Sequence, residues 1–158
     1  MSVIDIDLAM RHLLAEPDDQ VLIQAQLDAA ENAASKFLQR RFYADAVALA
    51  SATSSVAGLR LSARAVYDSA RLAADSIENG CDRDVSRNEA RQVFEEASAE
   101  IAAIARGIVI NPSISAACLL KLGHLFANRE EVVTGISAVE LPLASQNLLM
   151  PYRIGMGI

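Results

Sequence analysis

The spacing of the apolar residues constrains the fold of this chain more than any other feature. Along most of the sequence these residues recur at alternating intervals of four and three, which places them on one face of an α-helix. The first clear stripe comprises Ile23, Leu27, Ala30, Ala34 and Phe37. Hydrophobic residues make up 53% of the chain but aromatic residues only 4%, which favours helix–helix packing through small side chains. The sequence therefore predicts an all-α protein built as a small helical bundle.

Helix-start and helix-stop residues divide the N-terminal part, residues 1–50, into two helices and a short piece. The first helix covers about residues 6–16 and ends at Pro17, because the residue before a proline disfavours helical angles. The second helix begins after an acidic pair, where the helix dipole favours carboxylates, and runs to about residue 41. The small polar stretch from Ser51 to Ser55 is the best candidate for a linker.

Two further stripes flank one strong turn signal and predict a protruding antiparallel helical hairpin over residues 51–107. The first stripe comprises Leu59, Ala63, Val66, Ala70, Ala73 and Ile77, and the second comprises Ala90, Phe94, Ala97, Ile101, Ile104 and Ile108. Between them, Asn79-Gly80 ends a helix because both residues tolerate left-handed backbone angles, and the second arm resumes from Ser86. The expected register has Val66, Ala70 and Ala73 facing Phe94, Ala97 and Ile101.

The C-terminal part, residues 108–158, combines one strongly apolar helix with a short final segment. Asn111-Pro112 starts this helix, which is apolar almost all round as far as Asn128. A helix of this kind needs cover on most sides, and a neighbouring subunit could supply part of it. A short extended segment is expected at Ala138 to Leu141, followed by a last helix at Leu143 to Met150. All three parts are expected to form one domain.

Side chains that could carry chemistry are few. The two histidines, His12 and His124, have no metal-ligand partner at helical spacing, and His124 is interpreted as a core residue of its apolar helix. There is no glycine-rich phosphate loop, nucleophile elbow or CxxC motif. Acidic neighbours such as Glu95-Glu96 point about 100° apart on a helix and cannot converge. We therefore expect no enzymatic activity, no metal and no cofactor.

Charge, cysteine content and hydrophobic runs exclude further classes of protein. The net charge is −6, which opposes a protein whose main task is to grip phosphates. Cys81 and Cys118 do not suggest a bridge, so synthesis in a reducing cytoplasm is expected. The start of the chain has no basic and apolar leader, and no uninterrupted apolar run approaches the roughly 20 residues of a membrane span. We therefore expect no signal peptide and no membrane partner.

Three motifs, taken in order, resemble the head–tail connector family of tailed bacteriophages. Residues 123–133, Gly-His-Leu-Phe-Ala-Asn-Arg-Glu-Glu-Val-Val, are similar to the family signature GHLY-x-NRE-x-V. Leu141-Pro142 followed by residues 148–153, Leu-Leu-Met-Pro-Tyr-Arg, is similar to its closing LP…LL-x-PYR, and residues 6–13 to its opening L-x-x-A-K-x-H-L. The resemblance covers about residues 4–43 and 108–153. Residues 52–106 depart from compact members and resemble the insertion of longer ones.

The resemblance implies a structural virion protein that forms a ring, usually of twelve, under the portal vertex of a filled capsid. Such a ring adaptor joins the portal protein to the stopper or tail-completion protein. DNA passes through its centre as non-specific cargo. The protein would then act in the neck of the virion, after assembly in the host cytoplasm.

Within these motifs, two groups of residues receive roles. His124, Asn128, Arg129 and Glu130 are interpreted as structural, since a helix end is where they can cap the backbone and brace the next loop. The partner interface is expected at Leu141, Pro142, Leu148, Leu149, Pro151, Tyr152 and Arg153. A proline-marked extended segment suits edge pairing with another chain, and tyrosine and arginine often dominate interface energies. The alternative for Tyr152 and Arg153 is that they pin the C-terminus onto the domain.

The alternative function is the DNA-recognition ring of a packaging motor, similar to a small terminase subunit. It needs a helix-turn-helix with a basic recognition face. Residues 6–40 offer two helices joined at Pro17-Asp18-Asp19, but residues 1–55 contain eight acidic and four basic residues. This balance opposes phosphate binding and favours the connector.

Overall fold

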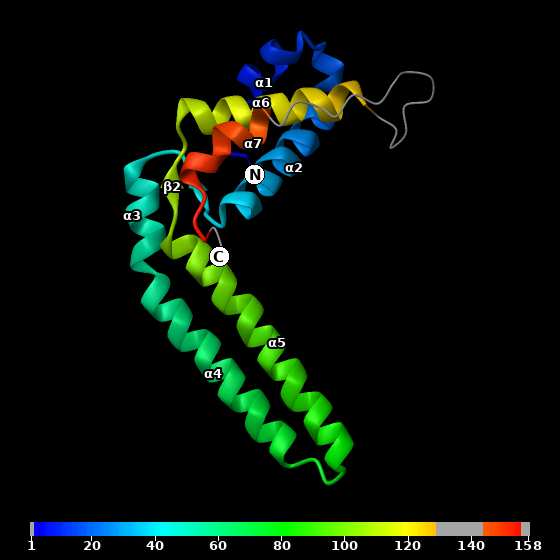
Figure 1. The fold of residues 1–158 in the computed structure, drawn as a ribbon, viewed down its shortest axis with the longest axis vertical. Helices are drawn as coiled ribbons and strands as arrows, with labels where there is room; N and C mark the ends of the chain where they lie inside the picture. Colours follow the sequence, from blue (N-terminus) through cyan, green and yellow to red (C-terminus); the bar gives the residue numbers. More distant parts are fainter. Residues whose placement is uncertain (1, 129–143, 156–158) are drawn as a thin grey trace. The chain divides into compact units, whose positions relative to one another are not determined.

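The computed structural model describes residues 2–128 and 144–155, and the chain divides into two compact units (Figure 1). The first unit combines Met1–Asp45 with Ile108–Ile158, and the second, which we call the hairpin unit, is Ala46–Gly107. Within the described ranges, extended pairing is limited to two short strands. The predicted all-α class is therefore confirmed.

The first unit is a small bundle of helices with one short strand pair. Its elements in chain order are α1 (Ile6–Leu13), η1 (Pro17–Asp19), α2 (Gln20–Leu38), β1 (Phe42–Tyr43), β2 (Ile108–Val109), α6 (Pro112–Ala127), α7 (Ala144–Leu149) and η2 (Met150–Tyr152). As predicted, Asn111 starts α6, because its side chain accepts a hydrogen bond from the N–H of Ile114 at 3.0 Å.

The core of this unit lies between α2 and α6, with α1 packed against both and α7 against α6. The predicted apolar stripe of α2 is confirmed. Ile23, Leu27 and Ala30 are fully buried, Ala34 is nearly so, and Phe37 packs at the edge of the core. The buried residues of α6 are Ile114, Ala117, Cys118, Leu119 and Leu122.

Helix α6 is covered less completely than its apolar composition suggests. Leu120 is 45% exposed, and Ala116 and His124 also face solvent. The interpretation of His124 as a core residue is therefore wrong. In a unit of this size the neighbouring helices cover only part of the circumference of α6, and His124 lies on the uncovered part of its last turn.

Helices α1 and α2 end earlier than predicted, each at a residue with left-handed backbone angles. Leu14 has a φ of 52° and Gln39 a φ of 56°. The N–H of each residue donates back to carbonyl oxygens of the preceding turn, a closure that usually employs glycine. Because neither position is glycine, the sequence gives no sign of the stop.

The parallel strand pair was not predicted from the sequence. Phe42 lies opposite Ile108, and Tyr43 opposite Val109. The N–H of Ile108 donates to the carbonyl of Arg41 at 2.9 Å. The chain leaves the first unit after β1 and returns at β2, so this pair holds the exit and the return side by side. The extended segment predicted at Ala138 to Leu141 lies outside the described residues.

The hairpin unit consists of α3 (Ala46–Ser54), α4 (Val56–Asp75) and α5 (Gly80–Ala105). The predicted linker at Ser51 to Ser55 is wrong, because α3 continues to Ser54 and α4 follows at once. The hydroxyls of Thr53, Ser54 and Ser55 donate to carbonyl oxygens three or four residues earlier, at 2.9, 2.7 and 2.7 Å. Small polar residues thus satisfy their hydroxyls inside helical backbone, and the unit begins at Ala46.

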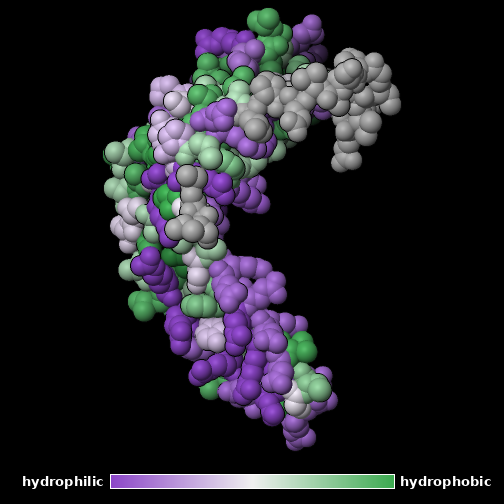
Figure 2. Space-filling view, in the orientation of Figure 1, coloured by the Kyte–Doolittle hydropathy of each residue, from purple (hydrophilic) through white to green (hydrophobic). Residues whose placement is uncertain are grey.

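The predicted turn of the hairpin is confirmed. Helices α4 and α5 lie side by side and antiparallel (Figure 1), and the Asn79 side chain caps α5 by accepting from the N–H of Cys81 at 2.9 Å. Helix α5 begins at Gly80, earlier than the expected Ser86. On the face shown in Figure 2 the hairpin is mostly hydrophilic.

The predicted register of the hairpin is right on α5 and only partly right on α4, where Ala70 faces inward but Val66 and Ala73 do not. On α5, Ala90 and Ile101 are buried and Phe94 and Ala97 are half-buried. On α4 the inward row is Ala63, Tyr67, Ala70 and Ala74, whereas Val66 and Ala73 are exposed. The ring centroids of Tyr67 and Phe94 lie 5.0 Å apart. The two inward residues that were missed, Tyr67 and Ala74, each come one position after the residue predicted. Tyr67 faces inward because an aromatic ring fills the space between the arms better than a valine does.

One described stretch, Ala46–Asp75, is long and apolar enough to cross a membrane by length and composition. Only 6% of its most apolar window is buried. The stretch contains no uninterrupted apolar run of that length, but its alanine, valine and leucine residues raise its mean hydropathy.

Candidate functional site

The C-terminal segment, expected to dock a partner, packs on its own unit over residues 144–155. Leu149 is 5% exposed and belongs to the core, and Leu148 and Tyr152 pack against the same core. Helix α7 lies against α6. These apolar side chains are therefore used inside the first unit, which limits what the segment can offer to another protein.

Polar contacts fix the same segment to α2 and the residues just after it. The guanidinium of Arg153 lies 4.8 Å from the centroid of the Phe37 ring, a cation–π arrangement. Arg40 Nη1 donates to the carbonyl of Tyr152 at 3.4 Å, and the N–H of Ile154 donates to the carbonyl of Leu38 at 3.3 Å. These contacts favour the interpretation that Tyr152 and Arg153 pin the C-terminus onto the domain.

The solvent-facing side of the segment is small and mixed in character. It comprises Gln146, Asn147, Met150 and Pro151, and Met150 is 42% exposed. Of the predicted interface residues in the described ranges, Pro151 is the exposed one. Leu141 and Pro142 lie outside the described residues.

The end of α6 holds the first part of the predicted structural motif. The backbone N–H of Asn128 donates to the carbonyl of His124 at 3.0 Å, and Asn128 Nδ2 donates to the same carbonyl at 2.9 Å. Nδ2 also lies 2.8 Å from the Nδ1 of His124. These hydrogen bonds close the end of α6, which agrees with the interpretation of Asn128 as a structural residue. Arg129 and Glu130 lie outside the described residues.

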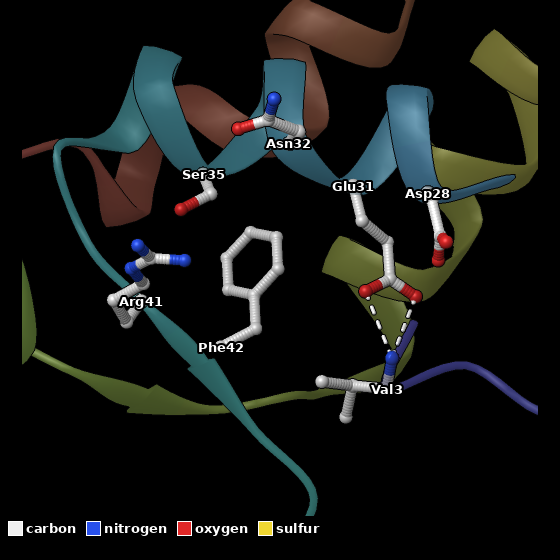
Figure 3. A pocket seen from close by; sticks show the side chains of 7 residues that line it. All are labelled: Val3, Asp28, Glu31, Asn32, Ser35, Arg41 and Phe42. Carbon is white, nitrogen blue, oxygen red and sulfur yellow. Dashed lines mark hydrogen bonds between the residues drawn. The ribbon is translucent and has the colours of Figure 1, made fainter. Parts of the chain in front are cut away.

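A polar pocket of about 370 Å³ lies beside α2 and β1 in the first unit (Figure 3). Its lining comprises Val3, Asp28, Glu31, Asn32, Ser35, Arg41 and Phe42. Figure 3 shows the Glu31 carboxylate turned toward the backbone of Val3, with Asp28 beside it and Arg41 at the opposite end, beyond the Phe42 ring. The pocket therefore separates an acidic end from a basic one.

Glu31 is a buried carboxylate that the sequence did not predict. It is 7% exposed, and its Oε1 accepts from the N–H of Ile4 at 2.8 Å. Both carboxylate oxygens accept from the N–H of Val3, at 3.0 and 2.9 Å. Desolvation by burial raises the pKa of Glu31 above its ordinary 4.5, and the hydrogen bonds from Val3 and Ile4 oppose that rise. Its partners are backbone groups distant in the sequence, so no motif signals the contact.

The chemistry that this pocket can perform is limited by how its groups are used. Both oxygens of Glu31 bind backbone N–H groups, and the Ser35 hydroxyl donates to the carbonyl of Arg40 at 2.6 Å. Among the described residues, no group of three or more His, Cys, Asp and Glu side chains converges as metal ligands would. We interpret the pocket as the anchor that fastens the N-terminal residues to α2.

Comparison with known proteins gives no family assignment. No protein-family model, no curated protein and no solved structure matches the chain.

Proposed function

We propose that the protein is a structural connector of a tailed-phage virion, a ring adaptor between the portal protein and the tail or stopper proteins. One observation carries the proposal. The segments that resemble the connector family, residues 4–43 and 108–153, belong to one compact unit, while residues 52–106 fall in the other. This division is what an insertion into a connector core would produce.

Contacts between the motif segments support the same proposal. Gly123 of the GHL motif lies against the opening motif, since a Cβ at this position would be 3.9 Å from His12 Nε2 and from Leu13 Cδ2. Ala9 of the opening motif and Leu149 of the closing one are buried in a single core. Motifs that are far apart in the sequence thus meet in space, as expected if they define one ancestral module.

The charge of the protein suits a component of a channel through which DNA passes. A net charge of −6 lets DNA pass without the phosphate neutralisation that retains it. The apolar residues Leu148, Leu149 and Tyr152 pack against the core of the first unit. The portal-facing surface would therefore be the exposed side of α7 and η2, around Met150 and Pro151.

Deletion of the gene from its phage tests the proposal. We expect filled heads and free tails that do not join, and we expect purified protein added to those heads to restore infectivity. Labelled protein should then be found at the portal vertex by electron microscopy. Normal tailed particles made without the protein would overturn the connector role.

A matched pair of variants tests the docking surface. Met150 and Leu8 are 42% and 41% exposed, so Met150→Glu and Leu8→Glu impose the same change at equal exposure. Met150→Glu should abolish the rescue of heads, and Leu8→Glu should retain it. Full rescue by both variants would remove the η2 surface around Met150 from the interface. Filter binding to DNA at moderate salt separates the alternative, because a packaging-motor subunit would bind its own phage DNA selectively.

A further inference from the structure

The hairpin unit carries an apolar groove along one side of the α4–α5 pair. Its volume is about 320 Å³, and its lining includes Ala63, Val66 and Ala70 from α4 and Ala90, Val93 and Ala97 from α5. Val66 and Val93, on its two edges, are 58% and 56% exposed. The exposure of these two valines, one on each arm, shows that no other part of the hairpin unit covers the groove.

The α5 side of the groove is acidic. Glu89, Glu96 and Glu100 are exposed and follow one another at intervals of seven and four, so they form one row on the helix. Val93 lies between this row and the inward-facing Phe94 and Ala97. The groove therefore has an apolar floor and one acidic rim.

The outward face of α4 carries the complementary pattern. Leu61, Ala65 and Leu72, which we call the ridge, recur at intervals of four and seven and so share one face. Leu61 is 74% and Leu72 is 66% exposed. One position before each ridge residue stands an exposed arginine, at Arg60, Arg64 and Arg71. Asp68 follows Ala65 by three positions on this face, and its carboxylate lies 3.1 Å from Arg64 Nε. The ridge is therefore an apolar row interrupted once, at Asp68, with a basic row beside it.

We propose that the ridge of one copy of this protein docks into the groove of a second copy, parallel to its α4 and antiparallel to its α5. In that orientation the two charged rows match in spacing. Reading α4 forward, the arginines are spaced by four and then seven, and reading α5 backward from Glu100, the glutamates are spaced by four and then seven. One alignment therefore places Arg60, Arg64 and Arg71 opposite Glu100, Glu96 and Glu89.

The handedness of the α-helix agrees with this alignment. Each arginine comes one position before its ridge residue, so the arginine row always lies about 100° around the helix on the same side of the ridge. When the ridge faces the groove and the two α4 helices are parallel, the arginine row lies on the side of the other copy's α5 and faces its glutamates. The other side of the docked helix carries the small residues Gly58, Ser62 and Ser69. They permit it to lie close to the α4 of the copy that provides the groove.

Groove and ridge are different surfaces, so the contact is heterologous. Each copy offers its groove to one neighbour and its ridge to another, and repetition gives a closed ring or an open helix of subunits. The inference goes beyond the connector proposal, since it uses the hairpin unit alone and would hold for any self-assembling protein with this hairpin.

Charge reversal in the full-length protein tests the contact by sedimentation velocity and native mass. Glu89→Arg with Glu96→Arg reverses the rim, and Arg64→Glu with Arg71→Glu reverses the row beside the ridge. Each double variant alone should lose self-association by about tenfold or more, because like charges then face each other. A mixture of the two should regain assembly, since both kinds of contact in the mixture again pair opposite charges.

Glu95→Arg is the matched control, because Glu95 is also exposed but lies away from the groove side of α5. It should assemble as the parent does, with helix content checked by circular dichroism for every variant. Three results would overturn the inference: a parent that stays monomeric at its highest concentration, reversed variants that keep the parent's mass, or a mixture that fails to regain assembly. A monomeric parent that floats with phosphatidylcholine vesicles would assign the apolar stretch of α3 and α4 to a membrane instead.

Discussion

The two units share the same helical spacing of apolar residues but bury very different amounts of them. In the first unit, α1, α2, α6 and α7 contribute to one cluster of thirteen buried residues. In the hairpin unit, the buried apolar residues are Val56, Ala74, Ala90 and Ile101. The spacing of apolar residues therefore indicates which face of a helix is apolar. Whether that face is buried depends on how many other helices cover it.

The two cysteines offer the largest contrast between the units. Cys118 in α6 is fully buried, and that burial raises the pKa of its thiol to about 12, whereas Cys81 at the start of α5 is exposed. Because the thiolate is the reactive form, iodoacetamide should modify Cys81 rapidly and Cys118 only when the first unit unfolds. Mass spectrometry of timed samples measures both rates. Equal rates would mean that Cys118 is not protected by the fold of the first unit.

Shortening the chain should destabilise the first unit when its C-terminal segment is removed, but not when the hairpin is shortened. Ending the chain after residue 143 removes Leu149 from the core and Arg153 from the Phe37 ring, so we expect a loss of about 4 kcal/mol or more and early melting. Removing one heptad from each hairpin arm should leave the melting of the first unit unchanged. Calorimetry follows both, and a collapse after the heptad removal would contradict the division into units.

Substituting one leucine in each unit sharpens the comparison. Leu122 is fully buried on α6, and Leu72 is 66% exposed on α4. Leu122→Ala should cost about 2–5 kcal/mol, because a cavity adds to the lost transfer free energy, whereas Leu72→Ala should change stability by less than about 0.5 kcal/mol. Urea denaturation of the isolated variants gives both values. A large cost at Leu72 would indicate that another copy covers it.

Features that depend on local residue patterns could be predicted from the sequence. The buried face of α2, the start of α6 at Asn111 and the hairpin turn at Asn79 each follow from spacing or from a capping side chain. The failures share a different cause. The burial of Glu31 depends on backbone N–H groups of Val3 and Ile4, which any residue type would provide.

The inward row of α4 and the contacts of the C-terminal segment with its own unit could not be predicted, for a related reason. Val66 and Tyr67 both fit a helical stripe, and only the facing Phe94 decides between them. Likewise, a short apolar helix ending in Tyr152 and Arg153 suits a partner or its own core equally well. In both cases the side chain that becomes buried depends on residues elsewhere in the chain. The spacing of apolar residues along one helix carries no information about those residues.

The buried carboxylate of the first unit should leave a signature in the pH dependence of stability. Burial raises the pKa of Glu31 in the folded state above 4.5, so the stability that this group contributes is fully present at low pH and is lost as the pH rises through the folded pKa. Glu31→Gln should therefore gain stability relative to the wild type as the pH increases from acid to neutral. Denaturation curves across this range measure the difference, with the exposed Glu16→Gln as control. A difference independent of pH would show that the carboxylate is not desolvated.

The smallest effect is expected for the exposed charges of the hairpin. Arg87 Nη2 lies 2.7 Å from Asp75 Oδ1, and the two side chains are 46% and 41% exposed. Water solvates both charges of an exposed ion pair, so forming the pair adds little free energy of stabilisation. A double-mutant cycle with Arg87→Ala and Asp75→Ala should therefore give a coupling energy of about 0.2–1 kcal/mol. Added salt should reduce it further, in contrast to the effect at Glu31, whose carboxylate is shielded from solvent. A coupling that persists in high salt would mean that the hairpin tip is covered in solution, and repeating the cycle below the concentration at which copies associate would identify the cover as another copy.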